Sequence, residues 1–533
     1  MSAKRELSWG GVLVCILCST VASGAALRDI TVSEIKSYQE NSLPVIVLAV
    51  DFQLDETLPT QIHGGSGRTT RTEQEAAQFP KMGFFTRDLI ADKVFGLEDA
   101  KRQLNAYYRW ASYGQIKLVP AQGLEQSLMA QVILRVKSRA DLKERYTFDS
   151  RVGVIEELGQ DKKIMRFLTD AVTAMLRDST YKAVSFQDAL LMLLVNISGR
   201  EWGRGAMGFL PSGKYWEFGV GPDSKAPGNR ICFPIGRDYT YRDYYLSRRE
   251  CFDSRQDQFV QGVAMFCRDG QLSCAPHDIV NVLKRASGVP PKRHTVIKGL
   301  YNNYLQDIWQ RDFRTNTSPY IGWWDVMADH LHMKIPEGPH PSMFFRSTPQ
   351  GMCAYTRLVM GWMPEDYVAT LSGRSRSVVL APLGVNKLPE PRGKIHLVAK
   401  VPLAPAMDKE GNRKDRYYLI EARRFMNNDD VRVDKTQYYG DRTYLPDRLI
   451  QKEGVLVYRV DMGKPMFGPK PEKGKVDRRN FVLVLEDQAG RRDGDLKEAP
   501  FSPGQVFKGE EGVRVEVAAD PANRKNYVIH VHR

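Results

Sequence analysis

The residues of this chain with the strongest chemical implication form the segment His-Asp-Ile-Val-Asn at 277–281. A hydrolytic zinc site uses the pattern His-Glu-x-x-His, because two imidazoles four residues apart share one helix face and bind one Zn²⁺, while the Glu activates the metal-bound water. Here Asp278 takes the Glu position and Asn281 takes the position of the second His. The pattern therefore predicts a helix that keeps one zinc ligand, His277.

Both changes weaken the predicted chemistry. The side chain of Asp278 is one methylene shorter than Glu, so its carboxylate would lie farther from a metal-bound water, and general-base catalysis depends on reach. Asn281 offers a neutral amide oxygen, which suits Ca²⁺ better than Zn²⁺. No intact His-x-x-x-His occurs among the nine His residues, and His330 and His332 are the possible replacement ligands. The alternative is that His277 is an ordinary hydrogen-bonded residue.

The first 25 residues predict a cleaved secretory signal. A basic start at Lys4 and Arg5 precedes an apolar run at 9–21 and small residues at 22–25. A membrane anchor is the alternative, but the run is shorter than the ~20 residues that a spanning helix needs. No later segment is apolar over that length, so we expect a secreted, extracellular protein without a transmembrane segment.

Two of the seven Cys residues lie in the signal segment, which leaves five in the mature chain. These are Cys232, Cys251, Cys267, Cys274 and Cys353. An odd number in an oxidising compartment predicts two disulfides and one free or intermolecular thiol. Cys267 and Cys274 flank an Arg-Asp-Gly turn sequence, which favours a short-loop disulfide between them, and Cys232 with Cys251 is a possible second pair.

The remaining surface signals concern glycans and charge. Asn196 begins an Asn-x-Ser sequon and is a candidate glycosylation site, whereas the sequon at Asn316 is followed directly by Pro319. The net charge of +14 favours acidic partners such as an anionic glycan. Because basic residues are mostly interspersed with acidic ones, the sequence argues against a nucleic-acid partner.

The order of elements predicts two types of architecture. A nearly continuous apolar run at 43–52 is typical of a buried central strand, and helical spacing at 98–110 and 161–176 alternates with further strands, as in an α/β layer. From about residue 367, short β-rich runs predict a sandwich. We therefore expect an α/β (α+β) domain at 26–365 and an all-β sandwich-like domain at 366–533. His530 and His532 alternate in the last run and should share one exposed strand face, with metal binding there as the lesser interpretation.

Several separated segments occur in a recognisable order along the chain: 50–52, Tyr-Tyr-Arg-Trp-Ala-Ser-Tyr-Gly at 107–114, the His277 segment, Gly-Trp-Trp-Asp-Val-Met at 322–327, Met-Gly-Trp at 360–362, Tyr-Tyr-Leu-Ile-Glu at 417–421 and Gly-Val-Leu-Val-Tyr at 454–458. Their order resembles that in the secreted metallopeptidases of the immune inhibitor A type. The resemblance spans most of the mature chain. It implies that the first domain is zincin-like.

The resemblance also assigns roles by position. The first zinc ligand of the family corresponds to His277, the general base to Asp278 and the second ligand to Asn281. Met327, preceded by Trp324 and Asp325, corresponds to the methionine of the Met-turn, which supports the metal from below. Without the family, Trp324 and Met327 are core residues, and Asp325 is a residue that hydrogen-bonds its own turn.

Three functions follow from these expectations. The first is a secreted metallopeptidase-like protein with impaired or lost zinc-dependent proteolysis, which binds an extracellular protein, peptide or anionic glycan. The second is an active zinc endopeptidase with a modified ligand set, and the third is a structural extracellular-matrix protein. Zinc is expected as a cofactor only in the active enzyme, because the pattern His-Asp-x-x-Asn lacks the second imidazole.

Overall fold

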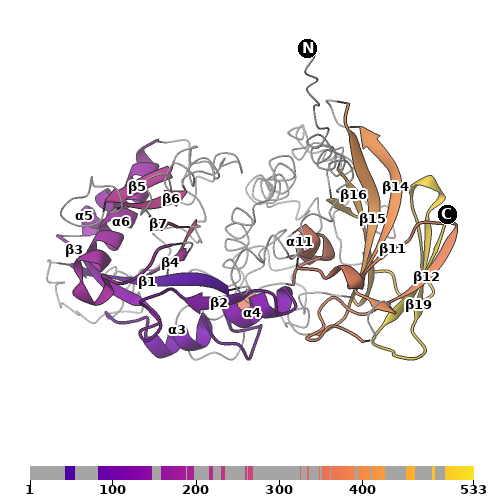
Figure 1. The fold of residues 1–533 in the computed structure, drawn as a ribbon, viewed down its shortest axis with the longest axis horizontal. Coiled ribbons are helices and arrows are strands. Elements are labelled where there is room, and N and C mark those ends of the chain that lie inside the picture. The colour runs from indigo at the N-terminus through magenta and orange to yellow at the C-terminus, as the bar shows by residue number, and fades with distance from the viewer. Residues whose placement is uncertain are drawn as a thin grey trace, which may run out of the picture.

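The chain forms a mixed α/β structure with several sheets and few helices (Figure 1). The computed structural model describes residues 42–54, 82–137, 139–146, 158–187, 189–196, 215–219, 230–234, 258–260, 262–267, 324–325, 333–334, 347–348, 351–359, 362–390, 394–407, 411–426, 452–462, 483–486 and 499–533. Within these residues, most of the helices gather around the first sheet, and two further sheets form the C-terminal part.

The first sheet has five strands, and all its pairings are parallel. They are β1 (Ser42–Leu54), β2 (Lys117–Pro120), β3 (Ala130–Val136), β4 (Leu190–Val195) and β8 (Gly262–Cys267). β1 lies in the middle, with β2 and β3 along one side and β4 and then β8 on the other. Residues 45–50 of β1 are at most 1% exposed, so the predicted buried central strand is confirmed.

Helices cover both faces of this sheet, which is why β1 and β4 are apolar at nearly every position. The helices are α3 (Arg87–Lys93), α4 (Leu104–Ala111), α5 (Arg139–Tyr146) and α6 (Leu158–Arg177). Phe167 of α6 lies in one core cluster with Ile46 and Leu48. On the opposite face, Tyr107 of α4 shares a cluster with Val45. The odd and even residues of β1 therefore belong to two separate hydrophobic layers.

Two short sheets accompany the first one. The larger contains β5 (Tyr215–Gly219), β6 (Arg230–Pro234) and β7 (Gln258–Phe259), and the smaller pairs β9 (Met333–Lys334) with β10 (Ser347–Thr348). β5 and β6 lie in the Gly- and aromatic-rich region of the sequence between β4 and β8. No helix in the described part of the chain is long and apolar enough to cross a membrane.

The C-terminal part contains two five-stranded sheets that share one core, as the β-rich runs predict. The inner sheet contains β11 (Val368–Thr370), β14 (Val398–Met407), β15 (Arg413–Arg423), β16 (Gly454–Asp461) and β17 (Leu483–Leu485). The outer sheet contains β13 (Ile395–His396), β12 (Ser375–Leu380), β20 (Tyr527–His532), β19 (Arg514–Ala519) and β18 (Val506–Lys508). Ile420 of the inner sheet and Ile529 of the outer sheet lie in this core.

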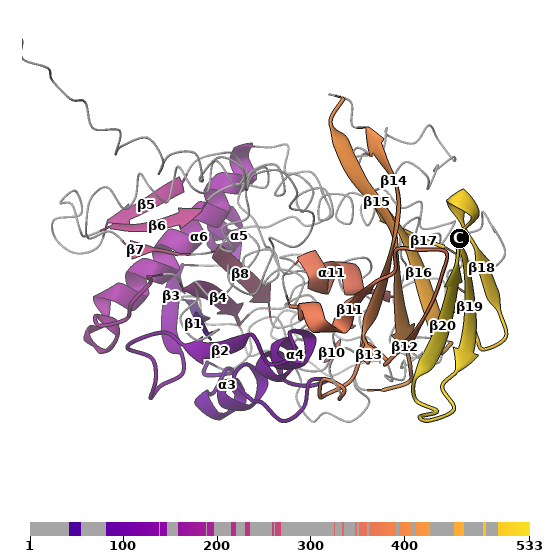
Figure 2. The ribbon, with the colours of Figure 1, turned by 45° about the vertical axis from the view of Figure 1, so that its right-hand side comes forward.

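The inner sheet is buried on both faces. Tyr418 of β15 faces the sandwich core, whereas Tyr417 belongs to the same cluster as Val45 of the first sheet. The short helix α11 (Ala354–Val359) lies between the α/β part and the inner sheet (Figure 2). The predicted boundary at 365/366 therefore separates two kinds of sheet, but one hydrophobic cluster runs across it.

Candidate functional site

The predicted zinc ligands His277, Asn281, His330 and His332 lie outside the described residues. The same applies to Asp278, at the general-base position, and to Met327 of the predicted Met-turn. The structure does describe the strand that precedes them, because β8 ends at Cys267. Open parallel sheets bind ligands at the carboxyl ends of their strands. In the sequence, the segment that contains His277 follows the carboxyl end of β8, which is the end of the sheet where a site is expected.

Asp51 lies toward the same end of β1 and is held by neighbouring donors. It is 2% exposed. Its Oδ2 accepts hydrogen bonds from the backbone N of Gly83 and from Nε2 of Gln131, both at 3.0 Å. Its Oδ1 accepts a hydrogen bond from Nδ2 of Asn196, which directly follows β4. Because these donors come from separate segments, Asp51 ties the carboxyl-terminal parts of β1 and β4 to the beginning of β3.

This geometry argues against the predicted glycan at Asn196. The side chain is 3% exposed, and the nitrogen that would carry the sugar donates to Asp51. A glycan at this nitrogen would have to break that hydrogen bond, and the buried position of the side chain leaves no room for a sugar. The sequon therefore marks a buried structural Asn in the folded chain.

Replacing Asp51 with Ala is expected to lower the free energy of unfolding by about 2 to 3 kcal/mol, because the buried amide of Asn196 would lose its acceptor. Urea unfolding followed by circular dichroism measures the change. Glu125 is a matched control, since its carboxylate accepts an exposed hydrogen bond, from the backbone N of Gly123. An equal loss for Glu125→Ala would contradict a special role for Asp51.

Trp324 and Asp325 are the described residues of the predicted Met-turn, and both are buried. Trp324 is 3% exposed and belongs to the core cluster, as its interpretation as a core residue predicts. Asp325 has a partner that the sequence did not predict: its Oδ2 accepts from the backbone N of Cys353 and from Oγ1 of Thr356, both at 2.7 Å. Asp325 therefore fixes the start of α11, which is a role that the predicted hydrogen bond within its own turn does not include.

Two charged residues of β15 complete this region, which we call the α11 joint (Asp325, Cys353, Thr356, Glu421 and Arg423). Arg423 donates from Nε to Glu421 Oε1 at 2.7 Å and from a terminal nitrogen to the carbonyl of Trp324 at 2.8 Å. The backbone N of Ala354 also donates to Glu421. Both charged side chains are at most 1% exposed. The inner sheet thus holds both α11 and the backbone of the predicted Met-turn.

The electrostatics of the α11 joint follow from its burial. Desolvation raises the pKa of Glu421, and the neighbouring Arg423 opposes that rise. The hydroxyl of Tyr458 adds a hydrogen bond to Oε1 of Glu421 at 3.0 Å. A buried carboxylate with these partners stabilises one arrangement of the chain and is inaccessible to a substrate.

Cys353 is a free, buried cysteine within the same joint. Burial raises the pKa of its thiol, as do the carboxylates of Asp325 and Glu421. A buried thiol of raised pKa is inert, so Cys353 fits the predicted odd cysteine as a free residue and is too buried for an intermolecular disulfide. Cys251 and Cys274 lie outside the described residues, and the predicted pairings with Cys232 and Cys267 stay predictions.

The aromatic segment at 107–114 joins the two parts of the chain. The indole nitrogen of Trp110 donates to the carbonyl of Gly384 at 3.0 Å, and the hydroxyl of Tyr113 donates to the carbonyl of Leu383 at 2.9 Å. The guanidinium of Arg357 lies 4.9 Å from each of these two rings. The segment therefore packs the α/β part against the residues between β12 and β13 of the outer sheet.

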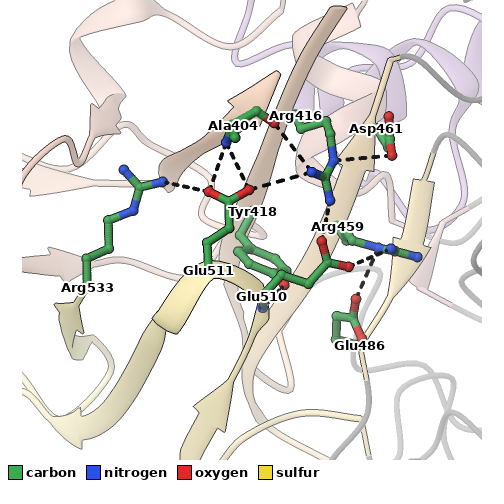
Figure 3. Close-up of polar contacts among 9 residues, drawn as sticks. All are labelled: Ala404, Arg416, Tyr418, Arg459, Asp461, Glu486, Glu510, Glu511 and Arg533. Atoms are coloured by element: carbon green, nitrogen blue, oxygen red, sulfur yellow. Dashed lines mark hydrogen bonds and ion pairs between the residues drawn. The ribbon is translucent and has the colours of Figure 1, made fainter. Parts of the chain in front are cut away.

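A second charged cluster links β15 and β16 of the inner sheet to the segment between β18 and β19 of the outer sheet (Figure 3). Arg416 and Arg459 both contact the carboxylate of Glu510, and Nε of Arg416 lies 3.3 Å from Asp461 Oδ2. The carboxylate of Glu511 accepts hydrogen bonds from the backbone N of Ala404, which lies beside the irregularity in the pairing of β14 with β15. Because its arginines and carboxylates neutralise one another, we assign this cluster to the joining of the two sheets.

Comparisons with known proteins do not extend these assignments. The chain matches neither a protein-family model nor a curated protein. Among the residues that the structure describes, no group of three or more His, Cys, Asp or Glu side chains is placed to hold a metal ion. The argument for the peptidase-type zinc site therefore rests on the donor types at 277–281.

The residues that sequence reasoning missed are the charged members of the α11 joint. Glu421 was included only as the last residue of the segment at 417–421, and Arg423 had no assigned role. A usable signal existed, because a charged residue within the apolar run at 417–422 is expensive to bury without a partner. The identity of that partner could not be read locally.

Proposed function

We propose that this protein is a secreted metallopeptidase-like protein with impaired or lost zinc-dependent proteolysis and a binding role toward an extracellular protein or peptide. The observation that carries the proposal is the parallel sheet whose strand β8 leads into a zinc-peptidase pattern with only one of its two imidazoles. The zincin-like fold and the secretory signal are part of the same proposal.

The donor set at 277–281 fits zinc poorly. Zn²⁺ takes imidazole, thiolate or carboxylate ligands, and Asn281 offers a neutral amide in place of an imidazole. Asp278 is also too short to be a direct replacement for Glu as a base. A protein with a peptidase-like fold that binds zinc weakly is suited to binding a peptide without cleaving it.

The buried α11 joint supports the first half of this proposal. Trp324 and Asp325 are fixed by Arg423 and by α11, so the segment that leads to Met327 starts from a rigid position. Such support is expected where a fold must keep a cleft in shape. The α11 joint carries the desolvation penalty of two buried charges, Glu421 and Arg423. A helix that only filled the space between two sheets would not need these charges.

An extended peptide is the ligand form that this sheet fits best. In the described part of the chain, β8 is the terminal strand of the parallel sheet. A terminal strand can accept a peptide as an additional strand, with main-chain hydrogen bonds providing affinity. The proposed binding role is therefore the addition of an extended peptide along β8.

Metal analysis of the purified mature protein, together with a cleavage assay on casein and a peptide library with and without chelator, tests the loss of proteolysis. We expect zinc well below one equivalent and no chelator-sensitive cleavage. Stoichiometric zinc with chelator-sensitive cleavage would overturn the proposal in favour of an active endopeptidase.

The double substitution Asp278→Glu with Asn281→His supplies the matched test of the donor argument. It restores the pattern His-Glu-x-x-His, so we expect the variant to retain more zinc than the natural chain under the same dialysis. Adding His277→Ala to this variant should remove the gain. If the restored pattern retains no additional zinc, residues 277–281 do not present one helix face to a metal.

A further inference from the structure

The last strand places two histidines side by side on the outer surface. Along β20, Tyr527, Ile529 and Val531 face the sandwich core, so His530 and His532 lie on the opposite face. This confirms that the two imidazoles share one strand face. Side chains two residues apart on a strand stand next to each other, a spacing at which two imidazoles can bind one metal ion.

Both imidazoles are oriented by serines of β12. Oγ of Ser377 lies 2.7 Å from Nδ1 of His530, and Oγ of Ser375 lies 3.2 Å from Nδ1 of His532. The strand register pairs each Ser with its His. Metal-binding histidines typically have a hydrogen bond at the ring nitrogen that does not bind the ion. Here the serines contact Nδ1, so Nε2 is the nitrogen that would bind a metal ion.

A carboxylate lies on the neighbouring strand. Glu516 of β19 is paired with His530 in the register, and its Oε1 lies 3.9 Å from Nε2 of His532. The side chains of Glu516 and His532 are 36% and 44% exposed, so an ion can reach them from solvent. At present Oε1 of Glu516 is 2.7 Å from a terminal nitrogen of Arg514, which holds the carboxylate away from a cation.

We propose that His530 and His532 bind a divalent transition metal such as Zn²⁺ through their Nε2 atoms, with Glu516 as the third ligand after it leaves Arg514. Two imidazoles and a carboxylate form a donor set that Zn²⁺ accepts, with water in the fourth position. The three side chains do not yet converge on one point, so the ion must compete with Arg514 for Glu516. The ion pair with Arg514 is therefore a built-in limit on the affinity.

Zinc titration of the full-length protein by calorimetry, with Co²⁺ absorption as a second readout of coordination, tests the site. All variants carry His277→Ala, so that the segment at 277–281 contributes no imidazole. We expect His530→Ala and His532→Ala each to weaken binding by at least about tenfold, since even the loss of a supporting outer group has that effect. Ser377→Ala should weaken binding about tenfold.

Arg514 and Lys508 form a matched pair of controls. They lie opposite each other on β19 and β18 and carry the same charge. Arg514→Ala should strengthen zinc binding because it releases Glu516, whereas Lys508→Ala removes a charge without releasing the carboxylate and should have a smaller effect. Equal effects of these two substitutions, or zinc binding that persists without both histidines, would overturn the proposal. Since the site shares no residue with 277–281, its failure and that of the proposed function are independent.

Discussion

Replacing Arg423 with Met is expected to lower the free energy of unfolding by about 3 to 5 kcal/mol, the cost of leaving a buried charge without its partner. Glu421 would lose its 2.7 Å ion pair while remaining inaccessible to water, and the carbonyl of Trp324 would lose a donor. Guanidinium unfolding measured by tryptophan fluorescence and circular dichroism gives the change.

The control for this prediction is Arg514→Met. Its ion pair with Glu516 has the same 2.7 Å distance, but the two side chains are 51% and 36% exposed. An exposed pair contributes no more than about 1 kcal/mol, so this substitution should change the free energy of unfolding little. If the two variants lose equal stability, burial is not what makes Arg423 important. The double variant Arg423→Met with Glu421→Leu should recover part of the loss, because it removes the unpaired charge as well.

The elements that could be predicted from the sequence are those whose signal is local. A strand whose sheet is covered by helices on both faces is apolar at nearly every position. The run at 43–52 has this pattern, which can be recognised without knowing what packs against it. The short β-rich runs after residue 367 predict the strands of the C-terminal sheets, because each run can also be recognised without knowing its partner strand. His530 and His532 share a face because strand alternation depends only on sequence spacing.

The α11 joint could not be predicted, because its partners are distant in sequence. Glu421 meets the backbone of Ala354, and Arg423 meets the carbonyl of Trp324 about a hundred residues upstream. No periodic pattern connects such positions. The burial of Asn196 could not be predicted for a related reason: three residues define the sequon, but the partner Asp51 comes from another strand.

The domain boundary shows where composition and packing differ. The change of texture near residue 367 marks the start of the C-terminal sheets, but successive residues of β15 face different cores. Tyr417 packs toward the α/β part and Tyr418 toward the outer sheet. A strand buried on both faces therefore connects the two predicted domains through one hydrophobic cluster.

Replacing Trp362 with Ala is expected to destabilise both parts of the chain together, by about 3 to 5 kcal/mol. Trp362 is 0% exposed, and its ring meets Tyr108 of α4 edge to face at 6.1 Å between ring centroids. Its backbone carbonyl accepts a hydrogen bond from Gln115 Nε2 at 2.8 Å. Since the cavity would open within the cluster that contains β1, hydrogen exchange should become faster in the amides of β1 and of β15.

Phe507→Ala is the matched control, because Phe507 is also a buried aromatic residue but lies in the sandwich core, edge to face with Tyr418 at 5.0 Å between ring centroids. Its loss should speed exchange in β19 and β20 more than in β1. A shared core predicts one cooperative unfolding transition for the Trp362 variant. Two separate transitions, with β1 unaffected, would show that the α/β part and the C-terminal sheets fold independently and that their common cluster contributes little to either.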